Sequence, residues 1–308
     1  MLAAIFGLKQ IAQDGWGWLP ALSILAGVAL GVLFVRRQRH LVDPFIDLQL
    51  FRMPGFSASL ATYGVGILLV FGGFLFLPQY LQLVLGLSPL EAGFWTLPWA
   101  LAFVVGSMLT PRIVRRVHPA FMMAAGLVLA AFGLGVFTQV DAASGFAAIV
   151  TGSVVFSLGT APLFTLTNDL IIGSAPPERA GAAAGLSETS AELGGALGIA
   201  FFGSIGTAIY RGAMAGGIPE GILQSAAETA RDTLGGAVEV AGQLPRPAGA
   251  SLIDAAREAF IQGLNLTAAI SGVGAIALAV FIAVLLRRMR VGSGPEGDAD
   301  LEQEPAIV

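Results

Sequence analysis

Apolar residues along this chain gather in long windows that are separated by short polar segments. The windows cover residues 17–35, 56–85, 91–111, 119–138, 145–171, 182–210 and 263–286. A helix of about 20 apolar residues crosses the hydrocarbon core of a bilayer, so each window is long enough to span a membrane. The pattern predicts an all-α polytopic membrane protein. The apolar piece within residues 1–12 is too short to span and is expected to be the last half of a helix.

Composition supports this class and excludes several others. The 308 residues are 56% hydrophobic and only 12% charged, whereas soluble domains carry about 25% charged residues. The chain has no cysteine, which excludes disulfides, thiolate metal sites and a cysteine nucleophile. The two histidines, His40 and His118, lie beside arginines without a partner at metal-ligand spacing. We find no phosphate-binding glycine loop, zinc motif or Ser/His/Asp set, so no metal, cofactor, nucleic acid or enzyme activity is expected.

Basic residues fall in alternate loops and predict the orientation. They are Arg36, Arg37, Arg39 and Arg52 in the 36–55 linker, Arg112, Arg115 and Arg116 after the 91–111 window, Arg179 in the 172–181 loop, and Arg287, Arg288 and Arg290 after the last window. The loops at 13–16, 86–90 and 139–144 contain no arginine or lysine. Cytoplasmic loops of membrane proteins carry the excess of basic residues. We therefore expect the linker and the C-terminus in the cytoplasm of a cell-membrane protein.

Two segments differ from the apolar windows. Residues 211–262 are polar and rich in alanine, and Pro245 and Pro247 mark a break within them. Apolar residues recur at helical spacing over 223–241, at Leu223, Ala226, Ala227, Ala230, Leu234 and Val238. This pattern predicts one or two amphipathic helices outside the membrane, on its surface or over a cavity mouth. The tail at 291–308 is rich in Gly, Asp and Glu and is expected to be disordered.

Two carboxylates lie inside a predicted span. Glu188 and Glu192 are four residues apart in the 182–210 window, so they face the same side of a helix. A charge near the bilayer centre costs about 2.5–3.5 kcal/mol on insertion scales. Such residues usually face a protein interior and carry a function. Because two close carboxylates repel each other, one of them holds a proton more readily, which suits a proton-coupled step. A contact between Glu188 and Arg179 near the cytoplasmic face is the structural alternative.

The same window is rich in glycine. Gly194 and Gly198 are spaced for close helix approach, as are Gly181 and Gly185, and Gly195 adds to the small-residue face. Small residues at this spacing let a neighbouring backbone come near. We interpret Gly185, Gly194, Gly195 and Gly198 mainly as packing residues. The helix surface that they form can also let a neighbouring helix slide along it.

Charged residues mark the expected cytoplasmic turns. Residues 106–116 are expected to join two spans tightly, with Gly106 at a helix end and Arg112, Arg115 and Arg116 following. Basic side chains can stabilise neighbouring helix C-termini. Asp169 closes the 145–171 window and is expected to bond to the next helix or to Arg112. Glycines and Pro78 make the 56–85 window bendable, with Gln79 and Gln82 near its outer end. Bent helices are common where helices rock or line a cavity.

Several motifs together resemble a known family. They are SPLEAG at 88–93, PPERAGAAAG at 176–185 running into SET at 187–189 and ELGGALGIA at 192–200, and DPFIDLQLFR at 43–52. Residues 106–116 are similar to a degenerate copy of the family's cytoplasmic loop signature, with Thr110 and Pro111 in place of an Asp. On these motifs the chain resembles the C-terminal half of a major facilitator superfamily transporter. The branch it resembles is the 14-span drug:proton antiporters (EmrB/QacA type).

The resemblance implies an architecture. Residues 1–35 would end an extra central helix hairpin, 36–55 would form the linker, and 56–290 would form the C-terminal six-helix bundle of the major facilitator fold. Spans 56–85, 91–111, 145–171 and 182–210 would lie nearest the substrate cavity. The N-terminal six-helix bundle has no counterpart in the sequence, so the resemblance implies that it is a separate chain or a missing part of the same one.

The resemblance also implies an activity. The parent protein would export small organic compounds, amphipathic or cationic, in exchange for protons, with Glu188 and Glu192 handling protons or cations. Seven side chains would line the cavity: Phe71, Phe74, Gln79, Gln82, Trp95, Thr165 and Asn168. Three alternatives stay open: a non-transporting subunit or remnant, a transporter of another metabolite, and a membrane-embedded enzyme such as a lipid transferase. The last would need charged residues clustered at one membrane face, and the chain supplies few.

Overall fold

Long helices account for nearly all of the computed structural model. It describes residues 6–7, 10, 17–41, 48–141, 145–219 and 222–285. Within these residues, seven helices are long and apolar enough to cross a membrane, and each coincides with one of the predicted windows. The predicted seven spans are confirmed. Expectations for most of the first helical piece, the middle of the linker (42–47), the C-terminal arginines and the 291–308 tail fall outside the described residues.

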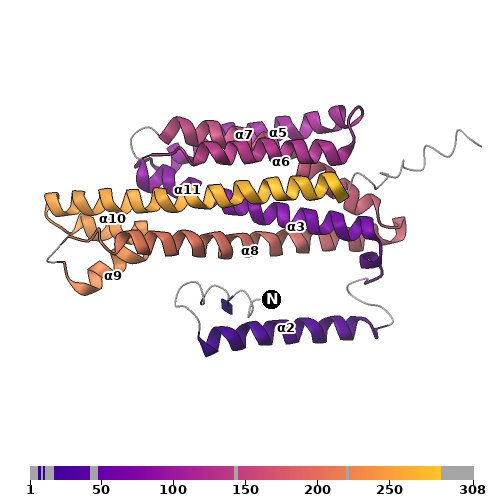
Figure 1. Ribbon diagram of the computed structural model, residues 1–308, viewed down its shortest axis with the longest axis horizontal. Coiled ribbons are helices and arrows are strands. Elements are labelled where there is room, and N and C mark those ends of the chain that lie inside the picture. The colour runs from indigo at the N-terminus through magenta and orange to yellow at the C-terminus, as the bar shows by residue number, and fades with distance from the viewer. Residues whose placement is uncertain are drawn as a thin grey trace, which may run out of the picture.

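The described spans fall into two groups. Helix α2 (Trp18–Gln38) is exposed along nearly its whole length and lies apart from the others (Figure 1). The remaining six pack side by side and are called the bundle below. They are α3 (Pro54–Phe74), α5 (Pro89–Val114), α6 (Pro119–Phe137), α7 (Gly145–Gly173), α8 (Ala180–Met214) and α11 (Arg246–Leu285). Short 3₁₀ turns, η1 (Leu50–Arg52) and η3 (Pro177–Arg179), precede α3 and α8.

The order of helices in the bundle follows from their contacts. Helix α7 packs between α5 and α6 and also touches α3, while α11 packs against α6, α8 and α3. Helix α3 packs along α8. One end of the bundle carries Arg52, Arg112, Arg115, Arg116 and Arg179 and is called the arginine-rich end. The opposite end is called the capped end, because α9 (Gln224–Asp232) and α10 (Leu234–Gly242) lie there (Figure 1).

Glycines bring α6 and α7 together in a way that the sequence analysis did not single out. A Cβ at Gly126 would lie 2.5 Å from the carbonyl oxygen of Gly159, and one at Gly133 would lie 2.7 Å from that of Gly152. The two backbones therefore touch at two levels. Small residues permit such close approach between membrane helices, and α6 is accordingly one of the most buried spans.

The predicted 56–85 span is interrupted. Helix α3 ends at Phe74, the three-residue helix α4 (Leu77–Gln79) follows, and a π-helical turn (η2) covers Tyr80–Val84. Pro78 lacks the N–H group that a continuous helix would need at this point. The segment stops at Gly86, which has a φ of 71°, a left-handed conformation that glycine adopts without a side-chain clash.

The segment between the last two spans is shorter than the predicted 211–262 insert. Helix α8 continues to Met214 and α11 begins at Arg246 instead of near 263. Forty residues in α11 make a helix about 60 Å long, about twice the thickness of a bilayer core. Its first turns are not apolar enough for an apolar window. In this part of α11, Leu252 and Ala256 are buried in the same cluster as residues of α10, against which α11 packs.

The amphipathic face predicted over 223–241 is only partly correct. The segment forms two helices that break at Thr233, whose hydroxyl accepts a hydrogen bond from the Gly236 N–H (3.0 Å). Ala230 and Leu234 are buried as expected, but Leu223 is 79% exposed. Because the break rotates α10 relative to α9, the buried positions of α10 are Leu234, Ala237, Val240 and Ala241.

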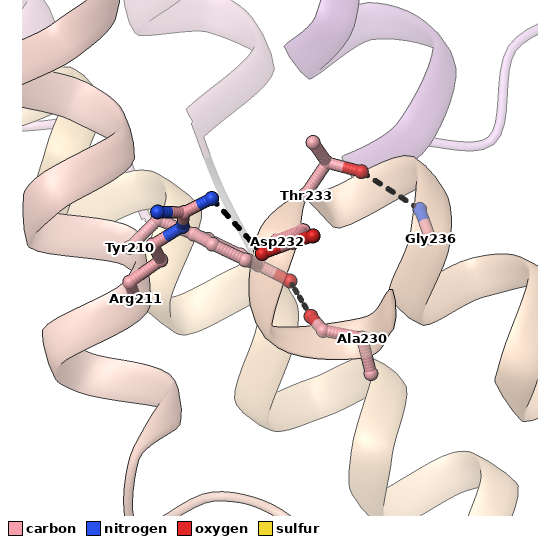
Figure 2. Close-up of polar contacts among 6 residues, drawn as sticks. All are labelled: Tyr210, Arg211, Ala230, Asp232, Thr233 and Gly236. Atoms are coloured by element: carbon pink, nitrogen blue, oxygen red, sulfur yellow. Dashed lines mark hydrogen bonds and ion pairs between the residues drawn. The ribbon is translucent and has the colours of Figure 1, made fainter. Parts of the chain in front are cut away.

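Two polar contacts fasten α9 to the end of α8 (Figure 2). The buried Tyr210 hydroxyl donates a hydrogen bond to the Ala230 carbonyl oxygen at 2.9 Å. The Arg211 guanidinium forms an ion pair with Asp232 at 3.0 Å. Tyr80 on η2 donates to the Asp141 carbonyl oxygen at 2.9 Å. Tyr80 and Tyr210 are thus packing residues of the capped end.

Candidate functional site

Glu188 and Glu192 lie on an open face of α8. Both side chains are exposed, as are Ala184 and Ala196 one turn to either side. Gly194, Gly198 and Phe202 of the same helix are buried and pack on α3 and the bundle core. The expectation that the two carboxylates would be enclosed is therefore not met by the described residues. No ion pair to either carboxylate, including one from Arg179 to Glu188, is found among those residues.

Polar side chains near Glu188 tie this part of α8 to its neighbours. A Cβ at Gly64 of α3, the residue after Tyr63, would lie 2.7 Å from the Ser190 Oγ atom. One residue before Glu188, the Ser187 hydroxyl lies 3.4 Å from Asn168 Oδ1 of α7. Ser190 donates to the Leu60 carbonyl oxygen of α3 at 3.3 Å. The carboxylate is thus placed where α3, α7 and α8 meet, with hydroxyl and amide groups from all three helices nearby.

The α8 glycines have two different environments. A Cβ at Gly194 would meet the carbonyl oxygen of Gly64, and one at Gly198 would lie 2.5 Å from that of Leu68. A Cβ at Gly195 would lie 3.4 Å from the nearest atom of the Phe71 ring. Gly185 differs from the packing expectation, because nothing within the described residues lies within 4 Å of its Cβ position. Its side of α8 is the open face that also carries Glu188.

The seven expected cavity residues are spread along the bundle instead of forming one cluster. Gln79, Gln82 and Trp95 are exposed near the capped end, and Gln79 donates to the Leu75 carbonyl oxygen of its own chain segment. The Trp95 ring lies against Phe146, and the Phe74 ring lies against Trp99 with centroids 4.7 Å apart.

Two others, Thr165 and Asn168, lie toward the arginine-rich end on α7. The Thr165 hydroxyl donates a hydrogen bond to the Ala161 carbonyl oxygen at 3.0 Å. These positions therefore lie at two levels along the bundle, and Phe71, which is 44% exposed, lies between them along α3.

The turn after α5 is shorter than expected. The helix continues through Pro111 to Val114, so Gly106 is an interior residue, and a Cβ there would lie 2.7 Å from that of Ala161 in α7. Arg112 donates to the Met108 carbonyl oxygen of its own helix at 3.2 Å. No bond from Arg112 to Asp169 is found among the described residues, and Asp169 is exposed.

Other charged residues at this end serve the turns. Arg115 and Arg116 are exposed in the α5–α6 turn. Arg179 donates to Gln49 Oε1 at 3.0 Å, which ties η3 to the end of the linker. The arginine-rich end is therefore held by local contacts and by the linker.

Three aromatic side chains that meet on α3, α5 and α7 were missed by the sequence analysis. The Phe164 ring of α7 touches Tyr63 of α3 and Phe103 of α5 edge-on, with centroid distances of 5.9 and 5.8 Å. All three are half-buried. Counting these three residues from the ends of their helices would have shown that they lie at a similar depth. A search for polar residues alone overlooks them. The described residues hold no cluster of His, Cys, Asp and Glu that could bind a metal ion.

Comparison with known proteins agrees with this architecture. The family model of the Major Facilitator Superfamily matches residues 1–199. The multidrug efflux pump LfrA of Mycolicibacterium smegmatis (strain ATCC 700084 / mc(2)155) is 36% identical over 94% of this chain and 57% of its own length. The tetracenomycin C resistance and export protein of Streptomyces glaucescens is 30% identical over 94% of this chain and 54% of its own length.

Further likenesses cover similar shares. The methyl viologen resistance protein SmvA of Salmonella typhimurium (strain 14028s / SGSC 2262) is 30% identical over 85% of this chain and 53% of its own length. The crystal structure of a bacterial homologue of the human lysosomal transporter Spinster, inward-facing and unoccupied, matches 94% of this chain and 67% of that one. Its TM-score is 0.54 at 16% identity, which shows the fold alone.

The chain thus spans little more than half the length of the relatives it matches. Its apolar helices make it an integral membrane protein, and the family model matches well over half of its residues. This chain belongs to the major facilitator superfamily.

Proposed function

We propose that this chain is part of a proton-coupled exporter of small organic compounds, of the drug:proton antiporter type. The observation that carries the proposal is the pair Glu188 and Glu192 on the open face of a membrane-spanning helix. A carboxylate inside a span is costly and usually marks a proton or ion pathway. Relatives named as a multidrug efflux pump and as resistance proteins support export as the direction of transport.

A second helix bundle would complete the transport path. Alternating access in this superfamily rocks two halves around a site between them, and this chain covers only 57% and 54% of the length of two of its relatives. We infer that the open face formed by α3, α5, α7 and α8 turns toward such a second bundle, in the same or another polypeptide. Glu188 and Glu192 would then lie in an enclosed cavity, where a negative charge favours proton uptake or a cation.

Roles follow from position on this face. Glu188 and Glu192 would exchange a proton for substrate, and Phe71, Phe74, Thr165 and Asn168 would contact substrate on the way. Gln79, Gln82 and Trp95 would line the exit at the capped end. The arginine-rich end would lie in the cytoplasm, in accordance with the positive-inside rule, and the C-terminus would lie there as well.

The test uses the protein in its native membrane. In the native host, Glu192→Gln at the chromosomal copy is expected to abolish efflux driven by the proton gradient while the protein is still made. Glu239→Gln, at an exposed glutamate of α10, is the matched control and should leave efflux unchanged. Normal gradient-driven efflux in the Glu192→Gln strain would overturn the coupling role.

A mass measurement tests the second bundle. If the intact polypeptide in the host membrane is much heavier than 31.6 kDa, the second bundle belongs to the same chain. A mass of 31.6 kDa requires a separate partner, which should co-purify with it. A lone 31.6 kDa species without a partner and without efflux would favour a non-transporting remnant.

A further inference from the structure

The end of the linker is docked against the bundle, and we propose that it is a detachable latch on the start of α8. The latch is Gln49 together with η1 (Leu50–Arg52). When it is docked, it holds the first turns of α8 against α3 and α7. When it is undocked, those turns are free to move. Such a latch would set how freely the start of the helix that carries Glu188 and Glu192 can move, whatever the protein transports.

Leu50 is the buried part of the latch. Its side chain is 0% exposed, whereas Gln49, Phe51 and Arg52 are exposed. It belongs to an apolar cluster with two buried residues of α3, one of α7 and two of α8: Phe56, Leu60, Ile171, Ala183 and Leu186. Leu50 is thus the residue of the latch that reaches into the junction of three membrane-spanning helices.

Hydrogen bonds hold the rim of the latch. The Arg179 guanidinium, just before α8, donates to Gln49 Oε1 at 3.0 Å. On the other side, the Ser57 hydroxyl of α3 donates to the Phe51 carbonyl oxygen at 2.9 Å. Both bonds lie at exposed positions, where water can replace them. The latch is thus tied to α8 and to α3 by bonds that can break without leaving a buried polar group unsatisfied.

The start of α8 depends on the latch for its packing. Among the described residues, no side-chain hydrogen bond caps its N-terminus, and nothing lies within 4 Å of a Cβ at Gly181 or Gly185. Ala183 and Leu186, the buried apolar residues of its first two turns, belong to the same cluster as Leu50. Withdrawing Leu50 from the cluster would therefore loosen α8 from its first residue to Leu186.

The contacts of the latch are few enough for it to open without unfolding the bundle. Undocking would expose one leucine side chain and exchange its hydrogen bonds for bonds to water, so the free-energy gap between the two states is small. A minor state separated by such a gap is populated at about 0.1–10%. The middle of α8 would stay in place, because Gly194 and Gly198 remain on the backbone of α3. The part that moves is the end of α8 next to the arginine-rich end.

Cysteine labelling measures the undocked population. Ala183 is fully buried in the cluster, whereas its neighbour Ala184 is exposed. Each is changed to cysteine in the native full-length polypeptide, which is purified in detergent and treated with N-ethylmaleimide, with the unsubstituted protein as the background. Ala183→Cys is expected to react about 10–1000 times more slowly than Ala184→Cys, because it reacts only while the latch is undocked. Equal rates would overturn the docked state, and no reaction before the protein unfolds would overturn the undocked one.

Changes within the latch assign the labelling rate to it. In the Ala183→Cys protein, Leu50→Ala should speed labelling about tenfold or more, and Gln49→Ala should speed it about two- to tenfold. Arg52→Ala, at an exposed residue of the same 3₁₀ turn, is the matched control and should change nothing. A rate that Leu50→Ala leaves unchanged would overturn the latch, and so would equal acceleration by Arg52→Ala.

A buried cysteine far from the latch separates local opening from general unfolding. Ala256 of α11 is fully buried at the capped end, so Ala256→Cys should stay unreactive when Leu50→Ala is added. Equal acceleration at this position would overturn a local latch. If Leu50→Ala does not fold, Gln49→Ala makes the same comparison, because it changes an exposed side chain. The labelling needs neither a substrate nor a proton gradient, so its outcome is independent of the efflux experiment.

Discussion

Gly198 of α8 lies directly on the backbone of Leu68 in α3, where an added Cβ would be 2.5 Å from the Leu68 carbonyl oxygen. The contact continues at Gly194, whose Cβ position meets the Gly64 carbonyl oxygen. Helix α8 is therefore pressed onto α3 along one side and presents its carboxylates on another. This close packing of α8 on α3 limits how far the face of α8 that carries Glu188 and Glu192 can project from the bundle.

We expect Gly198→Ala to destabilise the protein by about 1–3 kcal/mol, because the new methyl group has no space against a carbonyl oxygen. Gly185→Ala is the matched control on the same helix, with nothing within 4 Å of its Cβ position, and alanine is the better helix former there. Unfolding of the purified protein in mixed micelles, followed by circular dichroism, measures the difference. Equal stability of the two variants would contradict the contact.

Tyr210→Phe is expected to loosen the capped end. It removes the hydroxyl that donates to the Ala230 carbonyl oxygen, and an unsatisfied buried acceptor costs about 1–3 kcal/mol. Asp232→Asn removes only an ion pair between exposed groups, which is worth at most about 1 kcal/mol. Hydrogen exchange over 224–232 should speed up clearly in the first variant and little in the second. The reverse order would show that the ion pair holds α9.

The start of α5 offers a test of helix capping. Ser88 accepts a hydrogen bond from the Glu91 N–H at 3.3 Å, and its own N–H donates to the Glu91 carboxylate at 2.9 Å. Ser88→Ala should cost about 0.5–2 kcal/mol of stability, whereas Ser88→Gly should cost only a few tenths. Thermal unfolding of the three proteins gives the comparison. A larger loss with glycine than with alanine would argue against the cap.

A new disulfide would check the join between α8 and α11. A Cβ at Gly217 would lie 3.0 Å from that of Ala255, which is within about 1 Å of the usual Cβ separation in a disulfide. The chain has no native cysteine, so Gly217→Cys with Ala255→Cys should oxidise cleanly and lose reactivity toward a thiol label. The pair Gly185→Cys with Ala255→Cys should remain reduced. Free thiols in the first pair would contradict the structure of the capped end.

Hydrophobic windows were sufficient to locate the seven described spans. They could not give the length of α11, because such a window finds only the apolar part of a helix. The first turns of α11 are helical through Leu252 and Ala256, which pack on α10 outside the apolar stretch. The interruption of α3 was hidden for a related reason. Pro78 was visible as a source of bending, but the π-helical turn depends on how Tyr80 and Leu81 pack against the capped end.

The candidate site was only partly predictable. The spacing of Glu188 and Glu192 predicted that both lie on one face of α8. Whether their side chains are exposed depends on which helices cover that face, and the sequence of α8 alone does not show this. Phe103, Phe164 and Tyr63 are far apart in sequence and become neighbours only because α7 packs between α3 and α5. The glycines of α6 and α7 were overlooked because they are spaced by seven residues, not by four.

The length of α11 has a mechanical consequence. A straight rod about 60 Å long that tilts by about 10° at one end moves its other end by about 10 Å. Because α9 and α10 are packed onto the far end of α11 and are bonded to α8, they would travel with it as a single piece. A small rearrangement at the arginine-rich end would thus be magnified into a displacement large enough to widen or narrow the opposite mouth of the bundle.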